Sequence, residues 1–277
     1  MASKAFGVLC FSAALVAVVS LITLLVSLLI DGLPGVSWTF LTNSRSAFAD
    51  RAGILESLAG SALLLVLTAA VVVPVGIAAA VYLEEFVTKR NRLTELIEVN
   101  IANLSGVPSI VYGMLGLAVF VLALNLGRTV LAGALTLGLL VLPMVILVSR
   151  EALKAVPQSY RDGSLAVGAS RWKVIWTMVL PNAFPGILTG IILSLSRAVG
   201  ETAPLIVVGA ATLVTGMPTL DSNYTALPIT IFSWATHPKR DFQELSASGI
   251  VVIMAFLLIV NGLAIALRAR QESRLRA

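Results

Sequence analysis

Residues 6–30 read FGVLCFSAALVAVVSLITLLVSLLI, a run of 25 residues without a charged side chain. An α-helix rises about 1.5 Å per residue, so roughly 20 apolar residues cross the hydrocarbon core of a bilayer. A signal peptide also begins with a basic residue such as Lys4, but its apolar part spans only about 7 to 15 residues and a small-residue cleavage site follows it. No such site precedes Asp31. The run therefore predicts a retained transmembrane helix.

Five further apolar stretches of similar length follow along the chain. They are Ser57–Tyr82, Val99–Leu124, Val130–Val148, Phe184–Ala211 and Ser248–Leu267. Hydrophobic residues occupy 58% of the 277 positions and charged residues 12%, with a mean hydropathy of +0.99, which leaves too little polar surface for a water-soluble globule. The sequence predicts an all-α membrane protein of about six transmembrane helices, with residues 1–277 forming a single transmembrane domain.

Lysines and arginines are unevenly divided between the two sets of loops. If the N-terminus lies inside, the inner set is Lys4, Lys89, Arg90, Arg92, Arg150, Lys154, Arg161, Arg171, Lys173, Arg268, Arg270, Arg274 and Arg276. The outer set is Arg45, Arg51, Arg128, Lys239 and Arg240. Because cytoplasmic loops carry an excess of basic residues, this asymmetry predicts that both termini are cytoplasmic.

Two outer segments are long, at about Asp31–Glu56 and Thr212–Ala247. Their aromatic residues include Trp38, Phe40, Tyr224 and Trp234. A lid over a ligand is one interpretation, but amphipathic rings near a membrane surface favour interfacial anchoring.

Composition and motifs exclude several functions. Cys10 is the single cysteine, so no internal disulfide or cysteine metal cluster can form. The net charge is +5, but the basic residues form short clusters between apolar runs, which does not favour nucleic-acid binding. His237 is the single histidine, which makes it a poor metal or catalytic candidate, so we assign it no role. No Gly-x-x-x-x-Gly-Lys-Ser/Thr motif occurs, so we expect ATP chemistry only from a partner.

A polar segment, residues 150–182, separates the fourth and fifth apolar stretches. Within it, Gln158–Val167 is predicted to form a short helix that ends at Gly168. A second helix, capped by Ser170, is expected to end at Met178. The segment therefore predicts a cytoplasmic hook of two short helices joined at a glycine.

The spacing of this hook resembles the signature loop of ABC-importer membrane subunits, E-A-A-x3-G-x9-I-x-L-P. The matching residues are Asp162, Gly163, Ser164, Gly168, Met178, Leu180 and Pro181. Asp replaces Glu, Gly-Ser replaces the two alanines, and Met replaces Ile, while the glycine and Leu-Pro positions are kept. In that family the loop forms a coupling helix that docks in a groove of the ATPase subunit. The resemblance implies an ATPase-coupling role for Asp162, Gly163, Ser164, Leu165, Gly168, Leu180 and Pro181.

The residue types of the hook also favour docking by themselves. Leu165 and Val167 offer an apolar knob, and Arg161, Arg171 and Lys173 flank it, a pattern suited to helix-in-groove recognition. An ordinary solvated loop is the alternative, because basic cytoplasmic loops occur in any membrane protein. The Gly and Leu-Pro spacing favours docking.

Further segments resemble the PstA family of phosphate-transporter permeases. They are residues 101–113 (IANLSGVPSIVYG), 171–173 (RWK), 185–190 (PGILTG) and 197–205 (RAVGETAPL). Within the last of these segments, Glu201-Thr202-Ala203-Pro204 is more similar to PstA than to its partner permease, PstC. The resemblance runs from the second apolar stretch to the end of the chain. It implies a type I ABC-importer permease fold, a bacterial cytoplasmic (inner) membrane, and translocation of inorganic phosphate.

The same resemblance implies a set of partners. They are a second, PstC-like permease, a PstB-like ABC ATPase dimer that binds ATP-Mg, an external PstS-like phosphate-binding protein, and membrane lipid. It also implies that this chain is not an enzyme and binds no cofactor itself.

Arg197 and Glu201 place two charges within the fifth apolar stretch. A charge at the bilayer centre costs about 2.5 to 3.5 kcal/mol on insertion scales, so such residues usually face a bundle interior or an aqueous cavity. The two residues are four apart and share a helical face, where they can pair. Arg197 follows Phe184 by about 20 Å of helix, which predicts a position near mid-membrane.

A guanidinium offers five donors and stays charged, which suits a hydrated phosphate that has to exchange water for other hydrogen bonds. We therefore predict a substrate pathway at Arg197, Glu201 and the adjacent Thr202, with Glu201 holding Arg197 when the pathway is empty. The alternative is an ion pair that only fixes helix packing. Gly186-x-x-x-Gly190 indicates close approach of another helix, and the two roles can coexist.

Three other functions compete with this interpretation. An ABC permease for another oxyanion, such as sulfate or molybdate, would use Arg197 in the same way. An intramembrane enzyme is disfavoured because no span contains paired carboxylates, a Ser/His set or a His-x-x-x-His pattern. A stand-alone channel or secondary carrier would leave the hook without a role and would show uptake without ATP.

Overall fold

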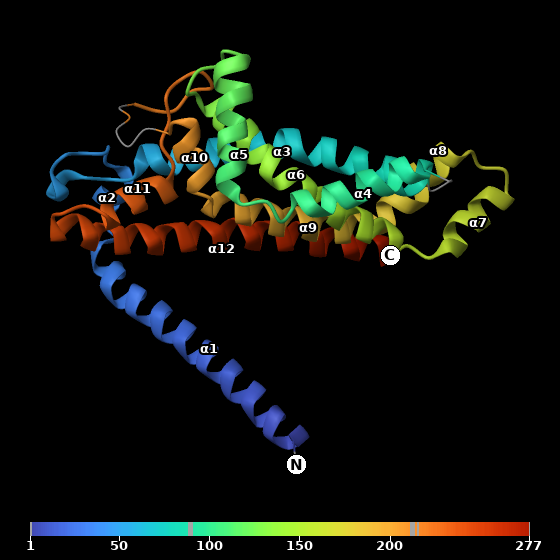
Figure 1. Cartoon of the computed structure of the whole chain (residues 1–277), viewed down its shortest axis with the longest axis horizontal. Coiled ribbons are helices and arrows are strands. Elements are labelled where there is room, and N and C mark those ends of the chain that lie inside the picture. Colours follow the sequence, from blue (N-terminus) through green and yellow to red (C-terminus); the bar gives the residue numbers. More distant parts are fainter. Residues whose placement is uncertain (1, 88–90, 211–213, 215, 277) are drawn as a thin grey trace. The chain divides into compact units, whose positions relative to one another are not determined.

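The computed structural model describes residues 2–87, 91–210, 214 and 216–276. All regular structure within these residues is helical (Figure 1). The chain divides into two compact units, one made of Met1–Leu55 and Thr230–Ala255, the other of Glu56–Ile229 and Phe256–Ala277.

Five described helices are long and apolar enough to cross a membrane. They cover Phe6–Gly35, Leu55–Phe86, Val130–Lys154, Arg171–Gly200 and Arg240–Arg270. Two shorter helices, Arg92–Leu104 and Ser109–Ala123, pass the same test as a pair, although a bend of 105° separates them. The predicted all-α membrane fold with about six spans is confirmed. The cytoplasmic location of the termini stays a prediction.

The bent pair replaces the straight third span that the sequence predicts. Helix α4 (Arg92–Leu104) ends before the turn at Gly106, and α5 (Ser109–Gly116) begins after Pro108 and continues as the π-helix η4 (Leu117–Ala123). Proline cannot donate a backbone hydrogen bond and disfavours helical geometry in the residue before it, so a continuous helix is interrupted here.

The first unit contains a cluster of tilted aromatic rings around Trp234. It contains α1 (Ala2–Gly32), η1 (Leu33–Gly35), α2 (Trp38–Thr42), η2 (Ala49–Arg51), most of α11 (Leu227–Ala235) and the first part of α12 (Arg240–Arg276). The ring of Trp234 lies 6.0 Å from that of Phe40 and 6.4 Å from that of Phe242. Arg45 lies 5.8 Å above the Trp234 ring and donates to Ser233 Oγ at 2.9 Å. These contacts join the first outer segment to α11 and α12.

Of the four aromatic residues expected at the membrane interface, Trp38 alone is exposed, at 78%. Phe40, Tyr224 and Trp234 are buried. A ring enclosed by protein cannot contact lipid, so the prediction of interfacial anchoring is wrong for these three. Burial raises the pKa of the Tyr224 hydroxyl, which has no hydrogen-bond partner among the residues that the structure describes.

The second unit is a bundle in which α6 (Val130–Lys154) packs against α3 (Leu55–Val81) and α9 (Leu180–Gly200) (Figure 1). A Cβ atom at Gly186 of α9 would lie 2.9 Å from Ala152 Cβ of α6, and one at Gly190 would overlap Val148. Only residues as small as glycine allow this approach. The close helix contact predicted from Gly186-x-x-x-Gly190 is confirmed, and its partner is α6.

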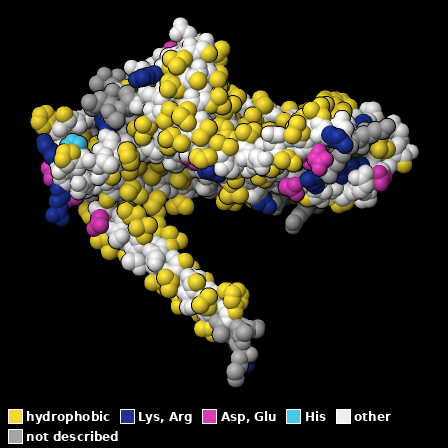
Figure 2. All heavy atoms as spheres, in the orientation of Figure 1, with side chains coloured by type: hydrophobic (Ala, Val, Ile, Leu, Met, Phe, Trp, Pro, Cys, Tyr) yellow, Lys and Arg dark blue, Asp and Glu magenta, His cyan; other side chains and the backbone are white. Residues whose placement is uncertain are grey.

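Charged side chains gather at one end of this bundle. Figure 2 shows hydrophobic side chains over much of the visible surface, with one group of Lys, Arg, Asp and Glu near α7 (Gln158–Ala166) and α8 (Arg171–Val174) and another near the start of α12. This distribution suits a bundle whose long helices contact lipid and whose hook lies in water.

Candidate functional site

Helix α9 stops at Gly200, and the short helix α10 (Ala203–Val208) follows Glu201 and Thr202. Pro204 has no N–H to donate to the carbonyl of Gly200, and its ring would clash with that carbonyl in a continuous helix. Glu201 accordingly has an extended backbone, with φ −76° and ψ 119°. The predicted pathway residues therefore lie at a break between two helices.

Arg197 occupies the last turn of α9 and pairs with Glu201, as predicted. Its Nε donates to Glu201 Oε1 at 3.3 Å. A cation at the C-terminus of one helix and an anion just before the N-terminus of the next both match the helix dipoles. The Arg197 side chain is 52% exposed and that of Glu201 17%. Because the bond uses Nε, it leaves the two Nη groups of an accessible guanidinium for other partners.

The place of Arg197 along its helix differs from the prediction. The helix begins at Arg171 and ends at Gly200, so Arg197 lies near its C-terminal end. The predicted span, Phe184–Ala211, is wrong at both ends. The helix begins upstream of Pro181, and Pro204 interrupts it after Gly200. Ala211 lies outside the described residues. The depth of Arg197 in the bilayer stays a prediction.

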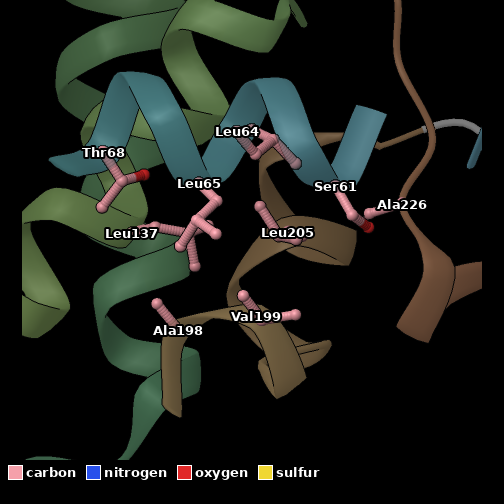
Figure 3. Close-up of a pocket in the computed structure, with 9 residues that line it drawn as sticks. All are labelled: Ser61, Leu64, Leu65, Thr68, Leu137, Ala198, Val199, Leu205 and Ala226. Atoms are coloured by element: carbon pink, nitrogen blue, oxygen red, sulfur yellow. The ribbon is translucent and has the colours of Figure 1, made fainter. Parts of the chain in front are cut away.

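Packing encloses the side of the break that Ala198, Val199 and Leu205 border (Figure 3). A cavity there is bordered by Leu65, Leu137, Ala198, Val199 and Leu205, with the polar Ser61 and Thr68 at its edge. Its volume is about 10 Å³, which is room for about one water molecule and too little for an oxyanion. Ser61 Oγ accepts from Leu227 N at 2.8 Å, and Thr68 Oγ1 donates to Ala134 O at 3.1 Å. This cavity therefore does not admit an oxyanion, whereas the Arg197 side chain is 52% exposed.

A second interrupted helix meets the first at this point. Helix α10 packs against α5, where a Cβ atom at Gly113 would lie 2.7 Å from Pro204 Cα. Helix α5 follows the 105° bend after α4, and α10 follows the break after α9. Interrupted membrane helices often form substrate and ion sites in transporters, because their ends expose unpaired backbone groups.

The hook forms at the positions that its glycine and serine predict. Helix α7 ends at Ala166, and Gly168 has a left-handed φ of +84°. Ala169 N donates to Ser164 O at 3.2 Å, and Ser170 Oγ accepts from Lys173 N at 3.4 Å to begin α8. The first short helix, its glycine end and the start of a second helix after Ser170 are confirmed.

The surface of α7 is open. Leu165 is 47% exposed and Val167, which follows the helix, is 85% exposed. A Cβ atom at Gly163 or at Gly168 would have no neighbour within 4 Å. Asp162 accepts from Gln158 Nε2 of the same helix at 3.1 Å. The predicted coupling residues of α7 are thus accessible to another protein.

Leu180 and Pro181 do not belong to the exposed hook. Helix α8 continues through the π-helix η5 (Ile175–Val179) into α9, so Leu180 begins a long helix. A π-helical turn accommodates an extra residue and absorbs the hydrogen bond that Pro181 cannot donate. The predicted helix end at Met178 is therefore wrong.

The sequence does not predict the partly buried ion pairs that connect the hook to its neighbouring helices. Arg161 of α7 pairs with Glu85 of η3 (Tyr82–Phe86), and Arg150 of α6 lies between Glu84 of η3 and Glu98 of α4. From the sequence, Arg150 is interpreted only as a signal of orientation and Arg161 as part of the basic rim of the hook, whereas in the structure Arg161 pairs with Glu85. The usable signal was the occurrence of glutamates beside the apolar stretches, where a charge usually has a partner on another helix.

A family model described as "Binding-protein-dependent transport system inner membrane component" matches residues 72–276. The chain belongs to this family. It is a permease component of a bacterial ABC transporter in the inner membrane, as the signature-loop resemblance implies. The match covers the hook and the helix break.

Individual relatives agree with this family. The chain is 36% identical to the "Probable ABC transporter permease protein YqgI" of Bacillus subtilis, over 94% of this chain and 92% of that one. It is 33% identical to the "Phosphate transport system permease protein PstA" of Xylella fastidiosa, over 85% and 81%. The predicted resemblance to PstA is confirmed. A chain of the inward-facing MetNI methionine ABC transporter has a TM-score of 0.61 at 16% identity, over 79% of this chain and 94% of that one, which shows the shared fold.

Proposed function

We propose that this permease moves inorganic phosphate across the membrane, along a pathway bordered by Arg197, Glu201 and Thr202. The observation that carries the proposal is the half-exposed Arg197 guanidinium at a helix break, bonded to Glu201 through Nε. The similarity to permeases named PstA supports phosphate as the substrate.

The chemistry of the pair suits a site that an anion crosses and leaves. A guanidinium binds two oxygens of phosphate at once, and Thr202 adds a hydroxyl donor at the break. Glu201 competes with the anion for Arg197, so binding stays weak. A conducting site has to bind well enough to admit an ion and weakly enough to release it. Between transport events, Glu201 also accepts a hydrogen bond from Arg197 and compensates its charge.

This chain borders only part of the pathway. The buried side of the break holds a cavity too small for an oxyanion, whereas the Arg197 face of α9 is exposed. In the proposal, a second, PstC-like permease covers that face and completes the passage.

ATP-driven motion enters at α7 in this proposal. The exposed Leu165 and Val167 enter a groove of a PstB-like ATPase, with Asp162, Gly163, Ser164 and Gly168 shaping the helix and its end. Leu180 and Pro181 act by connecting the hook to α9. ATP-Mg binds the ATPase, and a PstS-like protein delivers phosphate from outside. The permease then alternates between two states that ATP and the loaded binding protein favour differently.

The test is reconstitution of the complete transporter, with its co-purifying subunits, in proteoliposomes. Uptake of phosphate, sulfate and molybdate is measured with and without ATP. We expect ATP-dependent uptake of phosphate and none of the other two. Equal uptake of phosphate and sulfate would refute the phosphate assignment, and uptake without ATP would indicate a channel or secondary carrier.

A further inference from the structure

Arg161 ties the hook to two other helices. Its Nη2 donates to Glu85 Oε1 at 2.7 Å, and its Nε lies 3.2 and 3.3 Å from the two carboxylate oxygens. The same guanidinium donates to Leu153 O at 2.9 Å and to Val156 O at 2.7 Å. The side chains of Arg161 and Glu85 are 14% and 9% exposed. One arginine therefore fixes α7 to η3 and to the last turn of α6.

Arg150 extends this connection to α4. Its Nη2 lies 2.9 Å from Glu98 Oε1 and 3.5 Å from Glu84 Oε2, and its side chain is 4% exposed. Glu84 and Glu85 are neighbours in η3, so one π-helical turn reaches arginines on two different helices. Arg150 is buried and its two partners are partly buried, so moving these elements apart would leave the Arg150 charge without a partner, which is unfavourable.

Helix α4 leads from the ion pairs to the helix break. It carries Glu98 at its middle and leads, after Leu104, through the 105° bend into α5. Helix α5 packs against α10 where Gly113 meets Pro204, and α10 directly follows Glu201 and Thr202. A contiguous series of partly buried ion pairs and close packing therefore joins α7 to the break.

We propose that Arg161 and Arg150 are positioning residues that pass a displacement of α7, through Glu85, Glu84 and Glu98, to α4 and α5. The movement of α5 against α10 then changes the Arg197–Glu201 break. The inference rests on the proposed coupling role of α7. The competing route is the chain itself, which runs from α8 through η5 into α9, and the experiment has to separate the two routes.

The experiment follows α5 in the assembled transporter. Cys10→Ser removes the single native cysteine. Spin labels at Met114→Cys of α5, which is 54% exposed, and Leu258→Cys of α12, which is 70% exposed, report the distance between these helices. The distance is measured without nucleotide and after trapping with ATP and vanadate. Phosphate uptake per ATP hydrolysed is measured on the same preparations without labels.

Three variants are compared. Arg161→Ala removes the connection, and Glu85→Gln keeps the shape while removing the charge. Glu151→Gln is the matched control, because it breaks the Lys154–Glu151 pair of 3.0 Å, which lies nearby but within α6 and is exposed.

We expect the first two variants to retain the ATPase subunits and to hydrolyse ATP, while uptake per ATP falls about tenfold, an ordinary size for coupling between sites. The nucleotide-induced distance change should shrink in both and persist in Glu151→Gln. An unchanged distance shift and unchanged uptake per ATP in both variants would overturn the inference in favour of the α8–α9 route. If Arg161→Ala fails to assemble, Glu85→Gln and Glu98→Gln decide the question.

Failure of the phosphate assignment gives a different result. A parent transporter that takes up no phosphate but still shows the nucleotide-induced distance change refutes the substrate and leaves the spin-label comparison decisive. A parent that hydrolyses ATP without moving α5 overturns the inference directly.

Discussion

Arg197 and Glu201 form an ion pair with the same spacing and the same atoms as Arg240 and Glu244. The Nε–Oε1 distances are 3.3 and 3.5 Å, and each pair is four residues apart. Their surroundings differ: Arg240 and Glu244 are 88% and 71% exposed near the start of α12, whereas Glu201 is 17% exposed at a helix break. Substitutions in the two pairs can therefore be compared to find whether phosphate uptake depends on the position of the pair at the helix break or only on the loss of an Arg–Glu pair.

Arg197→Ala should lower phosphate uptake about 10- to 100-fold, because a charge-assisted hydrogen bond to the anion is worth roughly 1.5–3 kcal/mol. Arg240→Ala, which breaks the matched pair, should leave uptake near the parent rate. The measurement is ATP-dependent uptake in proteoliposomes, normalised to the amount of assembled transporter.

Parental uptake by assembled Arg197→Ala would mean that the pair serves only helix packing. An equal loss in Arg240→Ala would show that the defect does not depend on the helix break.

Gly168→Ala should weaken the hook, whereas Gly163→Ala should not. A Cβ atom has open space at both positions, but only Gly168 has a positive φ, of +84°. A left-handed conformation costs an ordinary residue roughly 1–2 kcal/mol, whereas alanine within a helix gains about 0.5–1 kcal/mol over glycine. Hydrogen exchange of α7 and retention of the ATPase on purification measure the two effects.

We expect faster exchange and poorer retention for Gly168→Ala, with slower or unchanged exchange for Gly163→Ala. Equal behaviour of the two variants would contradict a role for the left-handed turn.

Local chemistry explains which parts of this fold are predictable. The spans follow from runs of apolar residues, and the hook follows from Gly168 and Ser170, whose backbone preferences act within a few residues. The end of α9 was missed because hydrophobicity continues past Gly200, while the decisive constraint is the backbone nitrogen of Pro204.

Contacts between distant segments explain what could not be predicted. The Arg197–Glu201 pair lies within one stretch and was foreseen, but Arg161 and Glu85 are 76 residues apart. No local pattern selects Glu85 as the partner. The partner of Arg161 depends on how η3, α6 and α7 pack, and no local pattern in the sequence reveals that packing.

Gly190→Ala should destabilise the bundle by about 1–3 kcal/mol, because a methyl group would overlap Val148 of α6 and overpacking displaces its neighbours. Gly262→Ala in α12 is the control, since a Cβ atom there has no neighbour within 4 Å. Thermal unfolding of the purified chain in detergent compares the two. A melting temperature of Gly190→Ala equal to or higher than that of Gly262→Ala would contradict the close packing of α9 on α6.

Tyr224→Phe should leave stability unchanged or raise it. The Tyr224 hydroxyl is buried against Gly133 without a hydrogen-bond partner in the described part of the chain, so removing it relieves up to about 1–3 kcal/mol of uncompensated desolvation. Tyr224→Ala, by contrast, should cost roughly 3–5 kcal/mol through the cavity it leaves. Unfolding by denaturant in detergent measures both.

Tyr224→Phe should also change how the free energy of unfolding depends on alkaline pH. Burial raises the pKa of Tyr224 in the folded protein, so above about pH 10 the unfolded chain loses this proton while the folded chain keeps it. Unfolding then releases a proton, and the parent loses up to roughly 1.4 kcal/mol per pH unit that Tyr224→Phe does not lose. The difference in unfolding free energy between the two proteins should therefore widen in favour of phenylalanine from pH 9.5 to 11, by an amount on the order of 1 kcal/mol. A difference that stays constant would mean that Tyr224 ionises equally in both states, and so that water reaches its hydroxyl in the folded protein.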